Sequence, residues 1–517
     1  MDQQVNHWLL EARKLVSQKR VDDAAVFYRR ILERQEHPEA LLHLSFMASR
    51  EDRYRDALAL ARRVLAVGVG QAPNLVAGLM HRLRSFNESG AMRDYITSSG
   101  FLKDIHDPQM QVHVAAQLSW LGDQAGALAS IDRALAMAPR AAQLHLARAQ
   151  FLMFLGRFDE AERGIKECLR YAPDRAEAWW TLAGLRKWTH EDNHVDVIRK
   201  VLASGKPNLD EQANLQYALH QELDHLGDVP AAFAALDAAC KARRAATTYD
   251  PARIRRLFAR QKDLALESAP MEAEDFGFTP VFIVGMHRSG TTLLEQLMGG
   301  DPGVCNAGEL HDMASSLYHA FDHAYGWLPD DIALDRAGNL DSGAVGRRYM
   351  EGVSWRLAPS HTHITDKWPP NHASVGFILA ALPNARVIHM QRDPMETCFS
   401  NLRELFRGVA PYSYDQRELG DYCNQYRDLM AHWEQRFPDR ILQVNYDQLT
   451  RDTESTMRAV SDFCGLRYSD AMLQPNREGG SVATASVVQV RDKVIARSTP
   501  KWLPYEPYLQ PLRDALH

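Results

Sequence analysis

The chain has 517 residues, a length that predicts two or three domains rather than one. Its formal net charge of −6 disfavours a protein whose main task is to bind nucleic acid, since such domains are strongly basic. The six cysteines are scattered without a C-x-x-C pair. They therefore disfavour a disulfide framework or a zinc knuckle and favour single thiols in a reducing compartment.

The N-terminal segment has no basic region followed by an apolar run, so it does not have the pattern of a secretory signal. No apolar run approaches the roughly 18 residues that a membrane span needs, and residues 375–382 are among the longest. We therefore expect a cytoplasmic protein without a membrane span.

An internal repeat marks the first half of the chain. Residues 121–139 align without gaps to residues 155–173, and the matching positions, such as Gly122 and Gly156, are 34 residues apart. This is the period of the tetratricopeptide repeat, a pair of helices. Each glycine is placed to end one helix in a left-handed cap, and a proline closes each segment. A non-repeating helical bundle is the alternative.

Weaker copies of the repeat begin at Arg20, Arg53 and Leu226. The sequence thus predicts an all-α tetratricopeptide-repeat solenoid over residues 1–250, followed by a connecting helix and linker over residues 251–277. Solenoids of this kind expose a concave face that binds peptides or partner proteins.

The hydrophobic pattern changes in residues 278–517. Four apolar runs begin at Val281, His361, Ala385 and Arg440, and helical stretches begin near Thr291, Asn371, Pro394, Leu419 and Thr453. Alternation of buried strands with helices predicts an α/β domain in which helices cover both faces of a central parallel sheet.

A glycine-framed loop at residues 285–292 joins the first of these strands to a helix. Backbone N–H groups and the positive end of the helix dipole would meet there and form an anion cradle. Gly285 and Gly290 have the spacing of P-loop glycines, but Thr291 replaces the lysine that a nucleoside triphosphatase or kinase needs. The positive charge lies instead on Arg288. A tight turn without a ligand is the alternative.

Residues 284–296, VGMHRSGTTLLEQ, resemble the 5′-phosphosulfate loop of the sulfotransferase superfamily, whose enzymes use 3′-phosphoadenosine 5′-phosphosulfate (PAPS). A second family element follows at residues 385–402, with Arg392 and Ser400 in the positions that contact the 3′-phosphate of the nucleotide. The resemblance therefore implies a P-loop-like sulfotransferase domain that needs no metal. The implied nucleotide-binding residues are Arg288, Ser289, Gly290, Thr291, Thr292, Arg392, Ser400 and Tyr446.

The catalytic half of the chain is similar to the tyrosylprotein sulfotransferases, and the combined layout resembles a bacterial tetratricopeptide-repeat sulfotransferase. This resemblance implies that Glu309 is the general base, that Lys367 steadies the transferring sulfuryl group, and that Ser486 touches the same group. His287 and His311 flank the implied site and are rival bases. Leu310 stands where that family has a second Glu.

Two histidines, His361 and His363, could share one face of a strand, but two ligands without a third make a weak metal site, so we expect none.

The sequence as a whole predicts a PAPS-dependent sulfotransferase that releases adenosine 3′,5′-bisphosphate and modifies a hydroxyl, with a peptide or protein tyrosine recruited by the repeats as the first candidate acceptor. A saccharide, lipid or small-metabolite hydroxyl is the alternative acceptor. A non-catalytic repeat scaffold with a nucleotide-binding domain is the alternative class. No nucleic-acid partner is expected, and a homo-oligomer stays open.

Overall fold

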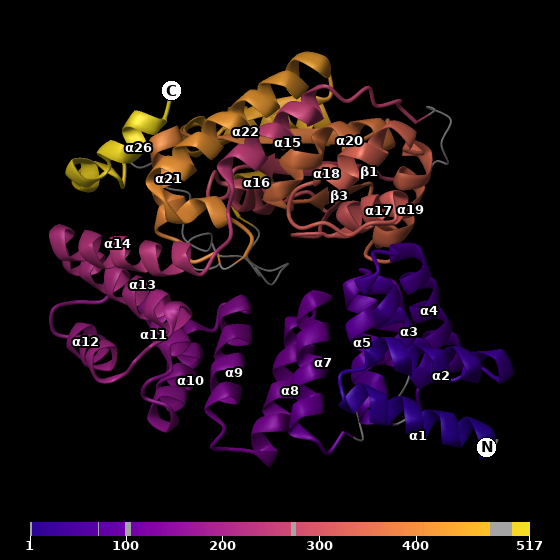
Figure 1. Ribbon diagram of the computed structural model, residues 1–517. Helices are drawn as coiled ribbons and strands as arrows, with labels where there is room; N and C mark the ends of the chain where they lie inside the picture. The colour runs from indigo at the N-terminus through magenta and orange to yellow at the C-terminus, as the bar shows by residue number, and fades with distance from the viewer. Residues whose placement is uncertain (1–2, 71, 99–104, 270–275, 407, 476–498) are drawn as a thin grey trace. The chain divides into compact units, whose positions relative to one another are not determined.

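The structure is a computed structural model of the 517-residue chain. It describes all residues except 1–2, 71, 99–104, 270–275, 407 and 476–498 (Figure 1). Ser486, one of the predicted site residues, lies outside the described residues.

Two compact units make up the chain. The first consists of Met1–Met137, His311–Gly326 and Asp330–Trp355. The second consists of Ala138–Leu310, Trp327–Pro329 and Arg356–His517. Each unit thus takes a part of the repeat region and a part of the second half of the chain. The predicted boundaries at residues 250 and 277 concern the order of domains along the sequence and stay predictions.

The repeat region is helical, as its sequence period predicts. Its helices in chain order are α1 (Gln3–Ser17), α2 (Val21–Arg34), α3 (Pro38–Arg50), α4 (Tyr54–Val67), α5 (Pro73–Ser85), α6 (Ser89–Ser98), α7 (Pro108–Trp120), α8 (Gln124–Met137), α9 (Ala142–Phe154), α10 (Phe158–Tyr171), α11 (Ala176–Ala183), α12 (Val195–Ser204), α13 (Leu209–Leu226) and α14 (Val229–Ala245). Neighbouring helices pack in pairs, such as α7 with α8 and α9 with α10.

The caps of these pairs follow the repeat. Gly122 and Gly156 precede α8 and α10 with φ angles of 89° and 76°, so both adopt the left-handed conformation that the sequence predicts. Ala127 and Ala161, at equivalent positions of the two helices, are fully buried. Small side chains at this position let the paired helices approach each other closely.

A connecting helix and an α/β region follow. Their helices and strands are α15 (Pro251–Lys262), β1 (Thr279–Gly285), α16 (Thr291–Met298), β2 (Val304–Asn306), α17 (Asp312–Phe321), α18 (Asp331–Arg336), η2 (Ala337–Asn339), α19 (Ser342–Ser354), β3 (His363–Asp366), η3 (Pro369–Ser374), α20 (Val375–Ala381), β4 (Arg386–Gln391), α21 (Pro394–Leu402), η4 (Pro411–Tyr414), α22 (Gln416–Arg436), β5 (Ile441–Asn445), α23 (Tyr446–Arg451), α24 (Thr453–Cys464), η5 (Asp470–Leu473), η6 (Leu503–Tyr508) and α26 (Gln510–Ala515). The η elements are short 3₁₀ helices.

The central sheet has the order β2-β3-β1-β4-β5, and all four strand pairs are parallel. The four predicted strands are present, and the predicted fold class is confirmed. Strand β2 was not predicted, because three residues are too few to show a strand period. Parallel order brings the carboxyl ends of the strands to one edge, where ligands bind in such folds.

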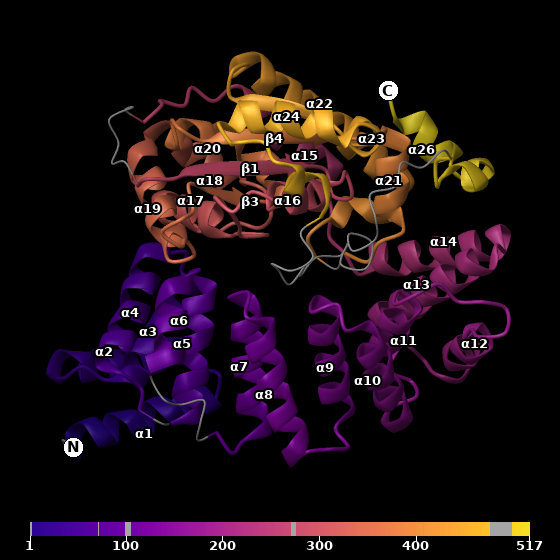
Figure 2. The same ribbon diagram turned by 180° about the vertical axis from the view of Figure 1, so that it is seen from behind.

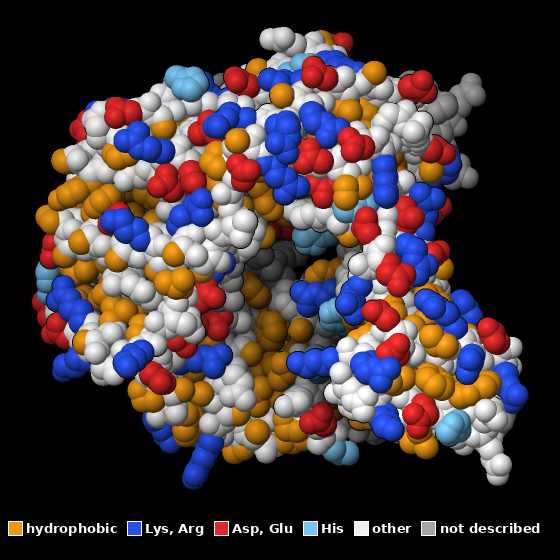
Figure 3. All heavy atoms as spheres, in the orientation of Figure 1, with side chains coloured by type: hydrophobic (Ala, Val, Ile, Leu, Met, Phe, Trp, Pro, Cys, Tyr) orange, Lys and Arg blue, Asp and Glu red, His pale blue; other side chains and the backbone are white. Residues whose placement is uncertain are grey.

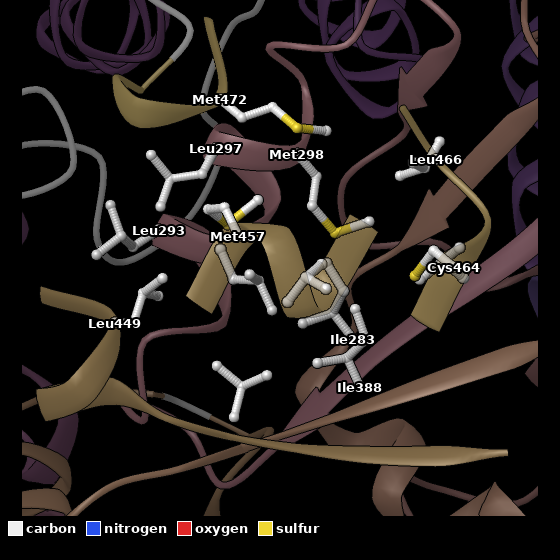
Figure 4. Packing of buried hydrophobic residues seen from close by; sticks show 14 of the residues in the cluster. Ile283, Leu293, Leu297, Met298, Ile388, Leu449, Met457, Cys464, Leu466 and Met472 are labelled. Carbon is white, nitrogen blue, oxygen red and sulfur yellow. The ribbon is translucent and has the colours of Figure 1, made fainter. Parts of the chain in front are cut away.

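Helices α16 and α24 pack through apolar side chains on one face of the sheet. Ile283 of β1 and Ile388 of β4 are register partners, and both are fully buried. They lie in one cluster with Leu297 and Met298 of α16 and Met457 of α24 (Figure 4). Helix α16 thereby follows the β1 loop in a fixed direction.

Helix α22 lies against the other face of the sheet. His389, one residue after Ile388 on β4, points the opposite way and bonds through Nδ1 to Glu434 of α22 at 2.5 Å. Figure 2 shows β4 from behind, together with α22 and α24. The sheet is therefore covered on both faces, as buried parallel strands require.

The described helices include none that is both long and apolar enough to cross a membrane. On the face that Figure 3 shows, Lys and Arg side chains are interspersed with Asp and Glu side chains. This mixture reflects a composition of 60 basic and 66 acidic residues.

The repeat cap yields a stability prediction. A Cβ added at Gly122 would meet no other atom within 4 Å. The effect of Gly122→Ala on stability therefore measures only the backbone strain of a residue with a side chain at a φ of +89°. We expect a loss of about 1–2 kcal/mol in the free energy of unfolding, measured by urea denaturation.

Gly338→Ala is the matched control, since its Cβ also meets nothing within 4 Å and Gly338 is not among the glycines with positive φ. An equal effect of both substitutions would contradict the capping role.

Candidate active site

The loop between β1 and α16 turns through two left-handed residues. Arg288 has a φ of 68° and Gly290 a φ of 105°. A side chain at the first position is unusual, and such strain concentrates at ligand sites. The turn directs the backbone toward the N-terminus of α16, where Thr291 and Thr292 are buried. The loop therefore has the form of an anion cradle.

Neither loop glycine can be replaced without displacing a neighbour. A Cβ on Gly285 would lie 2.6 Å from Ser289 Oγ and 2.9 Å from the Met390 carbonyl oxygen. A Cβ on Gly290 would lie 2.2 Å from the ring of Tyr446. Tyr446 thus packs directly on the loop, at the start of α23.

Arg288 carries the positive charge of the loop in a nearly enclosed position, with its side chain 8% exposed. Its Nε donates a hydrogen bond to Ser400 Oγ of α21 at 3.3 Å, and Glu404 lies 3.9 Å from its Nη1. Burial lowers the pKa of Arg288. Desolvation also raises the pKa of the Glu404 carboxyl. The structure thus brings together Arg288 and Ser400, which are distant in sequence.

Arg392 follows β4 and reaches the same loop. Its Nη1 donates to the Arg288 carbonyl oxygen at 3.3 Å, and its Nη2 donates to Glu396 at 3.0 Å. Its guanidinium carbon lies 4.5 Å from the centroid of the Tyr446 ring. Arg392 therefore ties α21, the loop and Tyr446 together.

Three buried polar atoms beside the loop have no hydrogen-bond partner among the described residues: Ser289 Oγ, Arg392 Nε and Thr397 Oγ1. All three residues line a cavity of about 680 Å³. Buried donors are seldom left without acceptors, so these atoms indicate a ligand that supplies oxygen atoms. The donor set and the cavity fit an anionic nucleotide such as PAPS.

Glu309 and Lys367 form an ion pair. Lys367 Nζ donates to Glu309 Oε1 at 2.7 Å, and the Lys367 side chain is fully buried while that of Glu309 is 38% exposed. The Lys367 backbone N–H donates to the Gly308 carbonyl oxygen at 2.8 Å. A buried ammonium needs a counter-charge, and here a carboxylate that reaches solvent supplies it.

Sequence reasoning missed Glu295, a buried residue of α16. Its Oε1 accepts hydrogen bonds from the Gly308 backbone N–H at 2.9 Å and from Thr365 Oγ1 at 3.0 Å. Burial raises the pKa of Glu295, although Lys367 and these hydrogen bonds act in the opposite direction. Glu295 therefore holds the loop that carries Glu309. The signal that could have revealed it was an acidic residue between the leucines of α16.

The two rival bases have different surroundings. His287 lies in the loop, with Nδ1 3.0 Å from the Tyr412 hydroxyl, and burial is the main cause that lowers its pKa to about 3. His287 is thus neutral at neutral pH and a weak proton acceptor. His311 directly precedes α17 and belongs to the other compact unit.

The histidine pair near β3 is engaged elsewhere. His363 Nε2 lies 2.9 Å from the Cys464 carbonyl oxygen, and His361 Nδ1 accepts from the Ala358 backbone N–H at 2.9 Å. The described part of the chain contains no group of three or more His, Cys, Asp or Glu residues placed to hold a metal ion.

Two family models match separate parts of the chain. The family described as "Sulfotransferase family" matches residues 280–470, and the family "Tetratricopeptide repeat" matches residues 121–185. Residues 280–470 thus match a sulfotransferase domain and residues 121–185 match tetratricopeptide repeats, so the resemblance predicted from the motifs is confirmed for these two parts of the chain.

Two individual relatives match parts of the chain. Over 338 residues the chain is 31% identical to an uncharacterised protein of Aquifex aeolicus (strain VF5), with 63% of this chain and 44% of that protein covered. Over 249 residues it is 25% identical to protein-tyrosine sulfotransferase 2 of Gallus gallus, with coverages of 44% and 64%. The chain thus spans less than two thirds of either relative.

Among solved structures, the sulfotransferase domain of the Synechococcus PCC 7002 olefin synthase is 20% identical, with a TM-score of 0.32. The match covers 45% of this chain and 91% of that domain.

Glu295 yields a prediction about pH. Because its pKa is raised in the folded state, its contribution to stability is present below the ordinary carboxyl pKa of 4.5 and is lost as pH rises through the folded-state value. Glu295→Gln keeps the accepting oxygen without this dependence. The unfolding free energy of the variant relative to wild type should increase as the pH rises, measured by urea denaturation at several pH values.

Glu351→Gln, at an exposed position of α19, is the control and should show no such trend. A constant difference between Glu295→Gln and wild type at every pH would refute this reading of Glu295.

Proposed function

We propose that the chain transfers a sulfuryl group from PAPS to an acceptor hydroxyl and releases adenosine 3′,5′-bisphosphate. The observation that carries the proposal is the ion pair of buried Lys367 with half-exposed Glu309, held by hydrogen bonds to α16, the helix that follows the anion cradle. Such a pair combines a cation for developing negative charge with a carboxylate that can take a proton.

The nucleotide is held by the loop and by α21. The backbone of residues 288–292 and the N-terminus of α16 bind the 5′-phosphosulfate, and Arg392 with Ser400 binds the 3′-phosphate. The unpartnered Ser289 Oγ and Arg392 Nε support this assignment, since each would gain an acceptor. Tyr446 packs beside Arg392, with the guanidinium carbon 4.5 Å from the ring centroid.

Each catalytic side chain has one task. When bound, PAPS supplies an activated sulfuryl group with a phosphate leaving group. Glu309 accepts the proton of the acceptor hydroxyl through its solvent-reaching carboxylate. Lys367 and Arg288 stabilise negative charge at the site, in the manner of the cations that assist phosphoryl transfer. Ser486 completes the predicted set, outside the described residues.

A protein tyrosine is the acceptor that we propose first. The similarity to relatives named protein-tyrosine sulfotransferases favours it, and the repeats supply a surface of the kind that binds peptides. All six cysteines are described and lie outside any disulfide, which supports our placement of the protein in the cytoplasm.

Nucleotide preference tests the cofactor. Adenosine 3′,5′-bisphosphate should raise the midpoint of thermal unfolding more than ATP does at equal concentration, because only the bisphosphate places a phosphate at Arg392. Arg392→Lys keeps the charge without the planar fork and should reduce the shift. A larger shift with ATP would rule out the proposed donor.

Glu309→Gln tests the base. The amide keeps the size of the side chain but cannot take a proton, so kcat should fall by about 10²–10⁴-fold while adenosine 3′,5′-bisphosphate still binds. Glu351→Gln serves as the control. Normal turnover of Glu309→Gln would assign the base to another residue, with His287 and His311 tested next.

A further inference from the structure

Helix α13 and helix α21 belong to the same compact unit, which contains Ala138–Leu310 and Arg356–His517. The two helices meet at the C-terminal end of α21. Tyr217 of α13, a buried residue, donates a hydrogen bond from its hydroxyl to the Leu402 carbonyl oxygen at 3.1 Å. The end of α21 is therefore held by a helix that the sequence predicts as part of the repeats.

Arg403, the residue that follows α21, is bound by two side chains of α13. Its Nε donates to His220 Nε2 at 2.9 Å, and its Nη2 donates to the Asp224 carboxylate. Asp224 also accepts from the Tyr505 hydroxyl at 2.5 Å. Burial alone would raise the pKa of Asp224, but Arg403 and Tyr505 outweigh it and lower that pKa. A charged carboxylate therefore faces the guanidinium.

The His220 ring carries its proton on the side that suits this contact. Its Nδ1 lies 2.9 Å from the Ala232 carbonyl oxygen, which can only accept, so Nδ1 holds the hydrogen. Burial is the main cause that lowers the pKa of His220 to about 3, so the ring is neutral at neutral pH. Its Nε2 is then unprotonated and accepts from Arg403. Two nitrogens of the guanidinium are thus fixed by α13.

Residues 400–403 connect α13 to the anion cradle. Arg288 of the cradle donates through Nε to Ser400 Oγ at 3.3 Å, and Asn401 Nδ2 donates to the His287 carbonyl oxygen at 2.6 Å. The next two residues of the segment bind α13. One short segment therefore carries described contacts from a helix of the repeats to the loop of the candidate donor site.

A pocket of about 80 Å³ lies where these contacts meet. It is lined by Arg288 and Ser400, by Gln221 of α13, and by Arg403, whose described hydrogen bonds use Nε and Nη2 but not Nη1. A single water molecule needs about 10–15 Å³, so the pocket has room for one phosphate group. Helix α13 thus forms part of its wall.

Three guanidinium groups lie near one another at this pocket. Burial is the main cause that lowers the pKa of Arg288, and the charges of Arg392 and Arg403 lower it further. Two acidic residues also line the pocket. Glu396 is paired with Arg392 at 3.0 Å, and burial raises the pKa of the Glu404 carboxyl, which disfavours its charged form. A phosphate bound here would offset the mutual repulsion of the guanidinium groups.

We propose that Arg403 is an additional ligand of the donor's 3′-phosphate, beside Ser400. His220 and Asp224 of α13 are the residues that position its guanidinium. The repeats are then part of the site that binds the donor, apart from any recruitment of an acceptor. The proposal rests on the proposed function, since it takes the donor to carry a 3′-phosphate.

Two nucleotides separate a phosphate ligand from a residue that only supports the fold. Adenosine 3′,5′-bisphosphate carries the 3′-phosphate and adenosine 5′-monophosphate lacks it, and isothermal titration calorimetry gives the dissociation constant of each. Arg403→Gln should weaken binding of the bisphosphate about tenfold or more, as expected for loss of a hydrogen bond to a charged group, and should change monophosphate binding by less than about twofold.

Asp224→Asn tests the positioning. It removes the charge that faces Arg403, so the bisphosphate should bind about three- to tenfold more weakly, again with little change for the monophosphate. KM for PAPS should rise by a similar factor while kcat stays unchanged, because the 3′-phosphate lies away from the transferred group. Lys241→Gln of α14 is the control and should match wild type, since Lys241 pairs with Asp237 and its side chain is 76% exposed.

Equal losses for the two nucleotides would overturn the proposal, because they would indicate a general disturbance of the site. An unchanged bisphosphate affinity in Arg403→Gln would overturn it as well. If Asp224→Asn does not fold, His220→Gln takes its place with the same expected results. A wild type that binds both nucleotides equally would contradict this proposal and the proposed donor together. The expected selective losses without any transfer by the wild type would remove the proposed function but keep the phosphate site.

Discussion

A lysine ammonium without contact to solvent is the charge around which the candidate site is arranged. Lys367 is fully buried at the end of β3, and a buried charge of this kind is tolerated only beside a counter-charge. Glu309 supplies that charge at 2.7 Å. The Gly308 backbone binds both Lys367 and Glu295, so the position of the carboxylate depends on strand β3 and on helix α16 at once.

The anion cradle and the ion pair are linked through the same helix. Helix α16 begins at the cradle, presents Glu295 to the loop of Glu309, and packs its apolar side on β1 and β4. Arg288 replaces the missing P-loop lysine as the local cation, and its contact with Ser400 extends the site toward α21. One well-packed helix thus orients the groups assigned to the donor and to the proton transfer.

Local patterns predicted much of this arrangement. The 34-residue period predicted the helix pairs and the left-handed glycines that cap them, and the apolar runs predicted four of the five strands. Other features depend on contacts between distant residues. Asp52 and His323 are 271 positions apart, and no local pattern connects them. The role of Glu295 follows from hydrogen bonds to Gly308 and Thr365, which no local pattern shows. The roles of Glu309, Lys367 and Ser486 remain predictions from resemblance.

The central claim is that the chain transfers sulfuryl groups from PAPS. Its most direct test is incubation of the purified protein with ³⁵S-labelled PAPS and a lysate of the organism that encodes it, followed by identification of the labelled species. We expect label in an acceptor hydroxyl, a protein tyrosine first, and loss of the label with Lys367→Met. Label no greater than that with heat-inactivated protein would contradict the account.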